Sequence, residues 1–385
     1  MRWNDQLVSV IILCYQNQGQ LRPTLESVLK QNYARLEIIL ADDSSDTFDA
    51  CVWENWINRN KEKNIENIVV FRNDVNLGTV KNLRKALSVM HGAYYMTISA
   101  GDIFYTNDVI STLMIHAAHN NHRELVIMGK AVHCDSNYQI KNDILPESDY
   151  AILRDRDSNA LFRRLIYRCC VTAVSSMHRK DFAEIVEGYD TDYRYYEDYP
   201  SYLRMARKGF TPLFVDKIVT LHVMDGIANN ADTATVEAVK GFYNDRELLY
   251  QKDIRPFLQG QPRNVIKKLT LRREMYQNQY LWTLWKKYTD IQRAFLILHH
   301  PWFFYFSLPK GLKTIERLFR GGVFCLLFLA LLKSSGALHG TLDMLVEYLL
   351  LGGCMVGLLS QVVYRSFALF FLTRSAWRKA AAGSN

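Results

Sequence analysis

The first hundred residues alternate between short apolar runs and segments with helical spacing. The apolar runs are continuous and rich in β-branched residues, which is typical of strands buried on both faces. These strands are predicted at 7–13, 36–41, 68–71 and 93–98. The segments between them place apolar residues on one helical face, and they span 20–30, 49–60 and 78–90. The alternation predicts an α/β fold with a mainly parallel, doubly wound sheet.

Three of these four predicted strands run directly into polar or acidic residues. Tyr15 follows the first strand, Asp42 and Asp43 end the second, and Asp102 follows the fourth. Ligands of doubly wound sheets bind outside the carboxyl ends of the strands. We therefore expect a ligand site at this edge of the sheet.

Between residues 109 and 222 the pattern is less regular, with strands predicted at 125–132, 170–175 and 213–221. One helix can be placed firmly after Glu197 and Asp198, because Pro200 suits its first turn and Gly209 suits its C-terminal end. Both acids then lie at the positive end of this helix, so we expect their ionised forms to be favoured.

Beyond about residue 231 the chain becomes helical, aromatic and basic. Residues 321–332 contain no charged side chain, and 345–364 supply nearly the ~20 apolar residues that a bilayer span requires. Basic residues flank both runs, so the positive-inside rule predicts a membrane hairpin at 321–372 with both ends cytoplasmic. A basic amphipathic helical region at 231–320 would precede it. Interfacial helices, or a buried hairpin that forms a homo-oligomer, remain open alternatives.

The charge distribution favours a membrane over nucleic acid as the anionic partner. From residue 251 to the end there are 19 Lys and Arg against 6 Asp and Glu, whereas the first 250 residues hold 28 against 33. Because the positive charge accompanies long apolar runs, it suits lipid headgroups better than a nucleic acid. The seven cysteines lack C-x-x-C spacing, which argues against a zinc site or a disulfide framework. We expect no signal peptide at the N-terminus.

Five motifs in sequence order carry a resemblance to a known family. They are VSVIILCYQN (8–17), EIILADDSS (37–45), NLG (76–78), YYMTISAGD (94–102), and GYD (188–190) followed by YEDY (196–199). Together, over about residues 7–222, they resemble the family 2 glycosyltransferases with a GT-A fold. The resemblance implies a Rossmann-like mixed sheet flanked by helices. Its nucleotide-sugar-binding half would occupy 1–108 and its acceptor-binding half 109–230, with a membrane-associated helical C-terminal region.

The resemblance also implies which residues contact a nucleotide-sugar, most simply a UDP-sugar. These are Leu13, Tyr15, Asn17, Asp42, Asp43, Lys81, Gly101 and Asp102. The ring of Tyr15 suits a uracil-type base, and Asp43 would accept the imide N–H of that base. The alternative for Asp43 is a cap on the following helix. Lys81 would contact phosphate, or it is a solvated helix residue.

A metal site is expected at the end of the fourth strand. The family usually supplies D-x-D or D-D there, whereas this chain has SAGD (99–102) and keeps only the last acid. The resemblance makes Asp102 a ligand for a divalent cation, Mg²⁺ or Mn²⁺, and His222 a second ligand. The alternatives are a turn-forming Asp and a structural His.

Asp198 is the candidate catalytic base. Inversion requires one carboxylate that removes the proton of the acceptor hydroxyl, although Asp198 can also cap its helix. We expect an inverting hexosyltransferase at the cytoplasmic face of the inner membrane. Its acceptor would be a glycan, most simply a polyprenyl-diphosphate-linked one in surface polysaccharide or lipopolysaccharide assembly. The alternative is a non-catalytic membrane module that binds nucleotides or glycans.

Overall fold

The computed structural model describes residues 5–223 and 234–300. The chain divides after Tyr276 into two compact units, which are described separately. Of the second unit, the described residues include α11 (Asp290–His299), which begins with a capping box formed by Thr289 and Gln292. The hairpin expected at 321–372 lies outside the described residues. Within the described ranges, no helix is long and apolar enough to cross a membrane.

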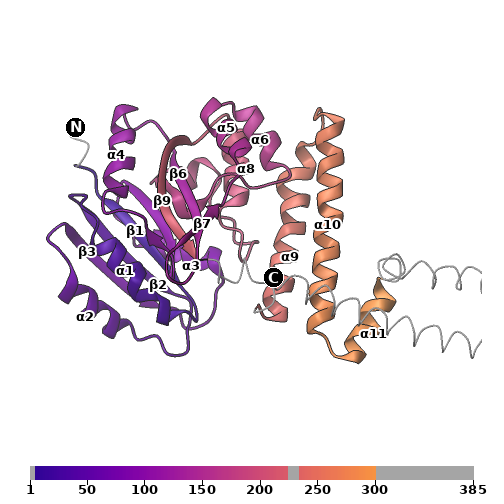
Figure 1. The fold of residues 1–385 in the computed structure, drawn as a ribbon, viewed down its shortest axis with the longest axis horizontal. Coiled ribbons are helices and arrows are strands. Elements are labelled where there is room, and N and C mark those ends of the chain that lie inside the picture. Colours follow the sequence, from indigo (N-terminus) through magenta and orange to yellow (C-terminus); the bar gives the residue numbers. More distant parts are fainter. Residues whose placement is uncertain (1–4, 224–233, 301–385) are drawn as a thin grey trace, which may run out of the picture. The chain divides into compact units, whose positions relative to one another are not determined.

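The described part of the first unit is built on a nine-stranded mixed sheet with the order β3-β2-β1-β4-β8-β6-β9-β5, and β7 pairs with β6 (Figure 1). The strands β1 to β4 are parallel, whereas β8 is antiparallel to β4 and to β6. The strands are β1 (Val8–Cys14), β2 (Leu36–Asp42), β3 (Ile65–Arg72), β4 (Tyr94–Ser99), β5 (Ile103–Phe104), β6 (Val126–Cys134), β7 (Ile140–Asp143), β8 (Ser176–Arg179) and β9 (Leu213–Val223).

Helices cover both faces of the sheet, and alternate residues of each central strand face opposite helices. In β1, Val10 and Ile12 belong to a buried cluster that includes residues of α1 (Leu21–Leu29) and α4 (Val109–His119), whereas Ile11 belongs to the cluster that includes residues of α3 (Thr79–Ser88) and α8 (Tyr199–Arg207). The helices of this unit are α1 (Leu21–Leu29), α2 (Ala50–Asn60), α3 (Thr79–Ser88), α4 (Val109–His119), α5 (Glu147–Asp155), α6 (Ser158–Leu165), α7 (Phe182–Ile185), α8 (Tyr199–Arg207) and α9 (Val236–Leu249), followed by α10 (Arg263–Lys287), which continues past the unit boundary. The predicted doubly wound core is confirmed for the first four strands.

The strand predicted at 170–175 is wrong. Ala173–Ser175 form a 3-10 turn, and β8 begins only at Ser176. Local hydroxyl bonds explain the turn, because Ser176 Oγ donates to the Thr172 carbonyl (2.7 Å) and Ser175 Oγ donates to the Gly129 carbonyl (3.0 Å). Such hydrogen bonds from side chains to the backbone compete with the backbone hydrogen bonds between neighbouring strands.

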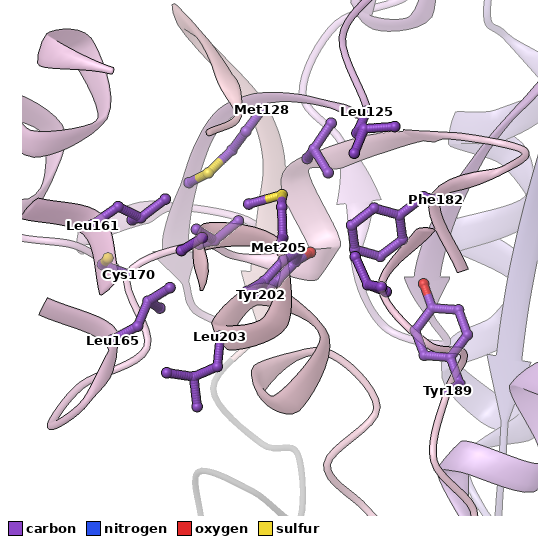
Figure 2. Packing of buried hydrophobic residues seen from close by; sticks show 14 of the residues in the cluster. Leu125, Met128, Leu161, Leu165, Cys170, Phe182, Tyr189, Tyr202, Leu203 and Met205 are labelled. Atoms are coloured by element: carbon purple, nitrogen blue, oxygen red, sulfur yellow. The ribbon is translucent and has the colours of Figure 1, made fainter. Parts of the chain in front are cut away.

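The helix α8 is fixed by its apolar face, as the sequence predicted. Tyr202, Leu203 and Met205 are fully buried, and they point into a core formed with α6, β6 and the segment around Phe182 (Figure 2). Because this packing holds the helix along its length, the first residue of α8 has a defined position. Asp198 directly precedes it.

His178 is expected to make the fold sensitive to acid. Burial lowers the pKa of His178 to about 3, and its Nε2 atom lies 3.0 Å from the hydroxyl of Tyr202. His178 therefore stays neutral in the folded protein, whereas in the unfolded chain it binds a proton near its ordinary pKa of 6.5. Protonation favours the unfolded state, so the folded state loses stability as the pH falls below that value. Between pH 6 and pH 5 we expect this residue alone to lower the free energy of unfolding by about 1 kcal/mol.

Urea unfolding at pH 6 and pH 5 measures this effect, with His178→Phe as the comparison. The variant should lose about 1 kcal/mol of the pH dependence, whatever its stability at neutral pH. An unchanged pH dependence in His178→Phe would show that His178 is not the responsible group.

Candidate active site

The turns after β1 and β4 are tied together at the carboxyl edge of the sheet. Asn17 Nδ2 donates to the Ala100 carbonyl (2.8 Å), and its Oδ1 accepts from the backbone N–H of Tyr15 (3.1 Å). The Leu13 carbonyl accepts from Ala100 N (3.0 Å). Gly101 follows with a φ of 110°, which favours glycine. The structure therefore brings Leu13, Tyr15, Asn17 and Gly101 together, and Tyr15 remains 39% exposed.

The two acids after β2 have different surroundings. Asp42 has no exposed surface, and its carboxylate accepts from the backbone N–H (2.8 Å) and the hydroxyl of Ser45. In this structure Asp42 therefore holds the turn and does not reach the surface of the site.

Asp43 connects the loop after β2 to the loop after β3. Its Oδ1 accepts from Leu77 N (2.8 Å) and Asn73 Nδ2 (3.0 Å), and its Oδ2 accepts from Gly78 N (2.8 Å). Asp49, and not Asp43, caps α2. Asp43 is 4% exposed. A carboxylate has about four acceptor positions, so Oδ2, which accepts from Gly78 N, has an acceptor position left.

Gly78 is the residue whose replacement should loosen this connection. Its φ is 84°, and a Cβ there would lie 2.6 Å from Arg194 Cγ and 2.9 Å from the Arg194 carbonyl oxygen. We expect Gly78→Ala to lower the free energy of unfolding by about 3 kcal/mol and to weaken nucleotide binding through Asp43.

A thermal melt and a UDP titration check this prediction. The control is Gly209→Ala, because Gly209 has a φ of 87° but no atom within 4 Å of the added Cβ. Gly209→Ala should lower the free energy of unfolding by only about 1 kcal/mol and leave the affinity for UDP unchanged. Equal effects of both variants would contradict the role given to the Gly78 contact.

Asp102 and His222 meet although they are 120 positions apart in the chain. Pairing of β5 with β9 places Ile103 opposite Leu221, so their neighbours lie side by side. His222 Nδ1 lies 3.0 Å from both carboxylate oxygens of Asp102, and Val223 N donates to Oδ1 (3.0 Å). The structure therefore brings the two predicted metal ligands together.

Both side chains are of the type that binds a divalent cation, since one offers carboxylate oxygens and the other a ring nitrogen. In this structure the 3.0 Å between His222 Nδ1 and the Asp102 oxygens is the distance of a hydrogen bond, so Nδ1 would have to lose its proton before it could bind a cation. The described residues hold no group of three or more His, Cys, Asp or Glu side chains suited to a metal. Burial alone would lower the pKa of His222, but its hydrogen bond to Asp102 and the charge of Asp102 outweigh burial and raise the pKa.

Asp198 is the N-cap of α8 and accepts from Tyr199 N (2.6 Å), so its capping role is present. The helix terminus favours the ionised form of Asp198, as expected, but burial acts against it, and for Glu197 the expectation is wrong. Burial raises the pKa of both carboxyls, and the charge of Asp198 raises that of Glu197 further. The Tyr199 N–H stabilises the Asp198 carboxylate, so Asp198 loses its proton at a lower pH than Glu197.

The topology places Asp198 at the same edge of the sheet as Asp102. The strands β6 and β9 run in the same direction as β4, because β8 is antiparallel to both β4 and β6. The helix α8 ends at Arg207, only five residues before β9 begins. The end of α8 therefore lies near the start of β9, at the amino edge of the sheet. The helix runs toward that edge, so its first residues lie on the side of the carboxyl edge.

Asp245 on α9 holds the loop that leads to the candidate base. Its buried carboxylate accepts from the backbone N–H groups of Arg194 (3.1 Å), Tyr195 (2.6 Å) and Tyr196 (3.1 Å). The Phe242 ring stacks on Tyr195 with centroids 4.3 Å apart. Sequence reasoning missed Asp245, since nothing in the pattern distinguishes it from other helical acids.

Lys81 is exposed in the first turn of α3. Neither interpretation of Lys81, as a phosphate contact or as a solvated residue, is decided by this position. It stays a candidate for the phosphate contact.

The comparison with family models matches residues 9–186 to glycosyl transferase family 2. The match covers a little under half of the chain. The mixed sheet flanked by helices fits the expected GT-A fold. The resemblance to family 2 is confirmed over the matched residues, which contain nearly all of the first four motifs, whereas the fifth motif lies beyond them.

Several curated proteins are similar to this chain. The UDP-Glc:alpha-D-GlcNAc-diphosphoundecaprenol beta-1,3-glucosyltransferase WfaP of Escherichia coli is 25% identical over 206 residues, which cover 53% of this chain and 72% of that protein. An uncharacterised glycosyltransferase of Haemophilus influenzae is 22% identical over 252 residues, covering 62% of this chain and 73% of its own.

Solved structures of similar shape include the mannosyltransferase PcManGT from Pyrobaculum calidifontis in complex with GDP-Man and Mn²⁺. It is 14% identical with a TM-score of 0.48, covering 91% of this chain and 86% of its own. Another is S. aureus TarS 1–349 in complex with UDP, which is 13% identical with a TM-score of 0.43, covering 72% of this chain and 80% of its own. This chain covers 53% of the longer S. aureus TarS chain.

Proposed function

We propose that this chain is an inverting glycosyltransferase that moves a sugar from a nucleotide-sugar to an acceptor hydroxyl. The observation that carries the proposal is the Asp102–His222 pair on the edge of the sheet where α8 and Asp198 begin. The match to family 2 supports transferase activity with a nucleotide-sugar donor.

The donor half of the site binds and orients the nucleotide-sugar. The exposed ring of Tyr15 provides a face for the base, and Oδ2 of Asp43 accepts its imide N–H. Asp102 and His222 would hold Mg²⁺ or Mn²⁺. When bound, such a cation offsets the negative charge that develops on the leaving diphosphate.

The acceptor half supplies the catalytic base. The acceptor oxygen forms a bond to the anomeric carbon while the bond from that carbon to the diphosphate breaks, and Asp198 takes the hydroxyl proton. A carboxyl whose pKa is raised toward neutrality suits this task, since a general base works best when its pKa lies near the working pH. Asp245 keeps Asp198 in place through the backbone of residues 194–196.

The acceptor that fits best is a polyprenyl-diphosphate-linked glycan at the cytoplasmic face of the inner membrane. The name of the E. coli relative describes transfer to such a diphosphate-linked acceptor. The basic residues of the C-terminal region would hold the enzyme against anionic lipid, and its helices would form the contacts of a homo-oligomer.

A screen of nucleotide-sugars with and without Mn²⁺ tests the proposal. The correct donor at 100 times its Kd should stabilise the protein by about 2.7 kcal/mol, and radiolabelled sugar should then appear on a lipid-linked acceptor. Metal-independent binding of a nucleoside diphosphate, without transfer of any sugar, would favour the alternative of a non-catalytic binding module.

A further inference from the structure

Two arginines share the ring of Tyr276 without an acidic partner. Arg246 on α9 lies 3.7 Å from the ring centroid, and Arg272 on α10 lies 4.9 Å from it. Arg272 Nε also donates to the Tyr276 hydroxyl (2.6 Å). Within the part of the chain that the structure describes, neither guanidinium forms an ion pair. By contrast, the adjacent Arg273 pairs with Glu247 (2.8 Å).

More positive charge surrounds the buried carboxylate of Asp149. Its oxygens lie 2.8 Å from Arg164 Nε and 3.3 Å from Arg168 Nε. Burial raises the pKa of Asp149, although the charges of Arg168, Arg164 and also Arg272 act in the opposite direction. Arg272 therefore belongs to the same region, where one carboxylate faces several guanidinium groups.

This excess of positive charge lies beside the candidate base. Burial raises the pKa of Tyr196, two positions before Asp198, whereas the nearby positive charge of Arg246 acts in the opposite direction. Arg168 is followed by Cys169, whose thiol pKa is raised first by burial and then by the charge of Asp198. The arginines thus border the start of α8, whereas the cation pair of Asp102 and His222 comes from β4 and β9.

Arginine is the side chain best suited to phosphate oxygens, because its planar fork offers parallel N–H donors and it stacks on aromatic rings. A guanidinium held on a ring and left without a carboxylate has donors free for a ligand. We propose that Arg246 and Arg272, held on Tyr276, bind the diphosphate of the acceptor. This inference rests on the proposed function, since it assigns the anion to the acceptor of the same transfer.

The arrangement gives the acceptor two fixed points. The diphosphate binds the arginines, and the sugar attached to it extends past Tyr196 so that its hydroxyl reaches Asp198. An acceptor without the diphosphate would lose one of these points, so its KM should rise more than its kcat falls.

Direct binding tests the site without relying on turnover. The full chain in phosphatidylcholine nanodiscs is saturated with UDP and Mn²⁺, so that the donor site is filled, and is then titrated with geranyl diphosphate. We expect saturable binding to the wild type, and a loss of at least about tenfold in affinity in the double variant Arg246→Gln/Arg272→Gln. The matched control Arg273→Gln should bind as the wild type does. Geraniol, which lacks the diphosphate, should not compete.

Three results would overturn the inference. They are unchanged affinity in the double variant, equal weakening in Arg273→Gln, or binding only to phosphatidylglycerol vesicles with no saturable binding of geranyl diphosphate. The last would indicate general attraction to lipid headgroups. Transfer activity separates the two proposals. A site that binds geranyl diphosphate in a chain that transfers no sugar would refute the proposed function alone, whereas transfer without this binding would refute the inference alone.

Discussion

Asp102→Asn is expected to lower kcat/KM for sugar transfer by roughly 10³-fold, because a bound cation contributes several kcal/mol to stabilising the leaving diphosphate. The amide removes the negative charge with which Asp102 would hold a cation together with His222, whose Nδ1 lies 3.0 Å from Asp102 Oδ2. The affinity for Mn²⁺ in the presence of UDP should fall together with the rate. Calorimetry with UDP and Mn²⁺, followed by steady-state kinetics, measures both quantities.

The control for Asp102→Asn is Asp143→Asn, which removes the same charge from an exposed position on β7. It should leave both quantities unchanged. Wild-type Mn²⁺ affinity in Asp102→Asn would contradict the metal assignment, even if transfer were slower.

Asp198→Asn is expected to lower kcat by about 10²–10⁴-fold, the range typical of a lost general base, while donor affinity stays near that of the wild type. The wild-type rate should rise with pH as Asp198 loses its proton. Because burial raises the pKa of Asp198, this rise should occur above the ordinary value of 3.8. A pH–rate profile of kcat/KM measures the position of the rise.

Glu197→Gln is the matched comparison for Asp198→Asn. Glu197 holds its proton to a higher pH than Asp198, so Asp198 already ionises beside a neutral neighbour. The variant should therefore keep the acid limb of the profile at its wild-type position. Full turnover in Asp198→Asn, or an acid limb that moves with Glu197→Gln, would remove Asp198 from the role of base.

The first four strands could be predicted from the sequence because they depend on local patterns. Continuous apolar runs identified β1, β2 and β4, and the polar residues after them necessarily meet at one edge of a parallel sheet. The pairing of Asp102 with His222 was predicted through resemblance to the family. It could not be deduced from spacing, since it depends on β5 pairing with β9.

The acceptor half was harder to predict because its interactions are long-range. Asp245 holds residues 194–196 from α9, and Arg246 reaches Tyr196 from the same helix. No periodic pattern marks such contacts. The ionisation of Glu197 was also misjudged, because a helix terminus is visible in the sequence whereas the burial that outweighs it is not.

A crystal structure with Mn²⁺ and an unreactive donor analogue tests the shared site of Asp102 and Asp198 most directly. We expect an anomalous manganese peak at coordination distance, roughly 2.0–2.6 Å, from Asp102 and His222. The Asp198 carboxylate should face the anomeric carbon from the side opposite the diphosphate. Manganese bound elsewhere, or Asp198 turned away from the donor sugar, would contradict this division of roles.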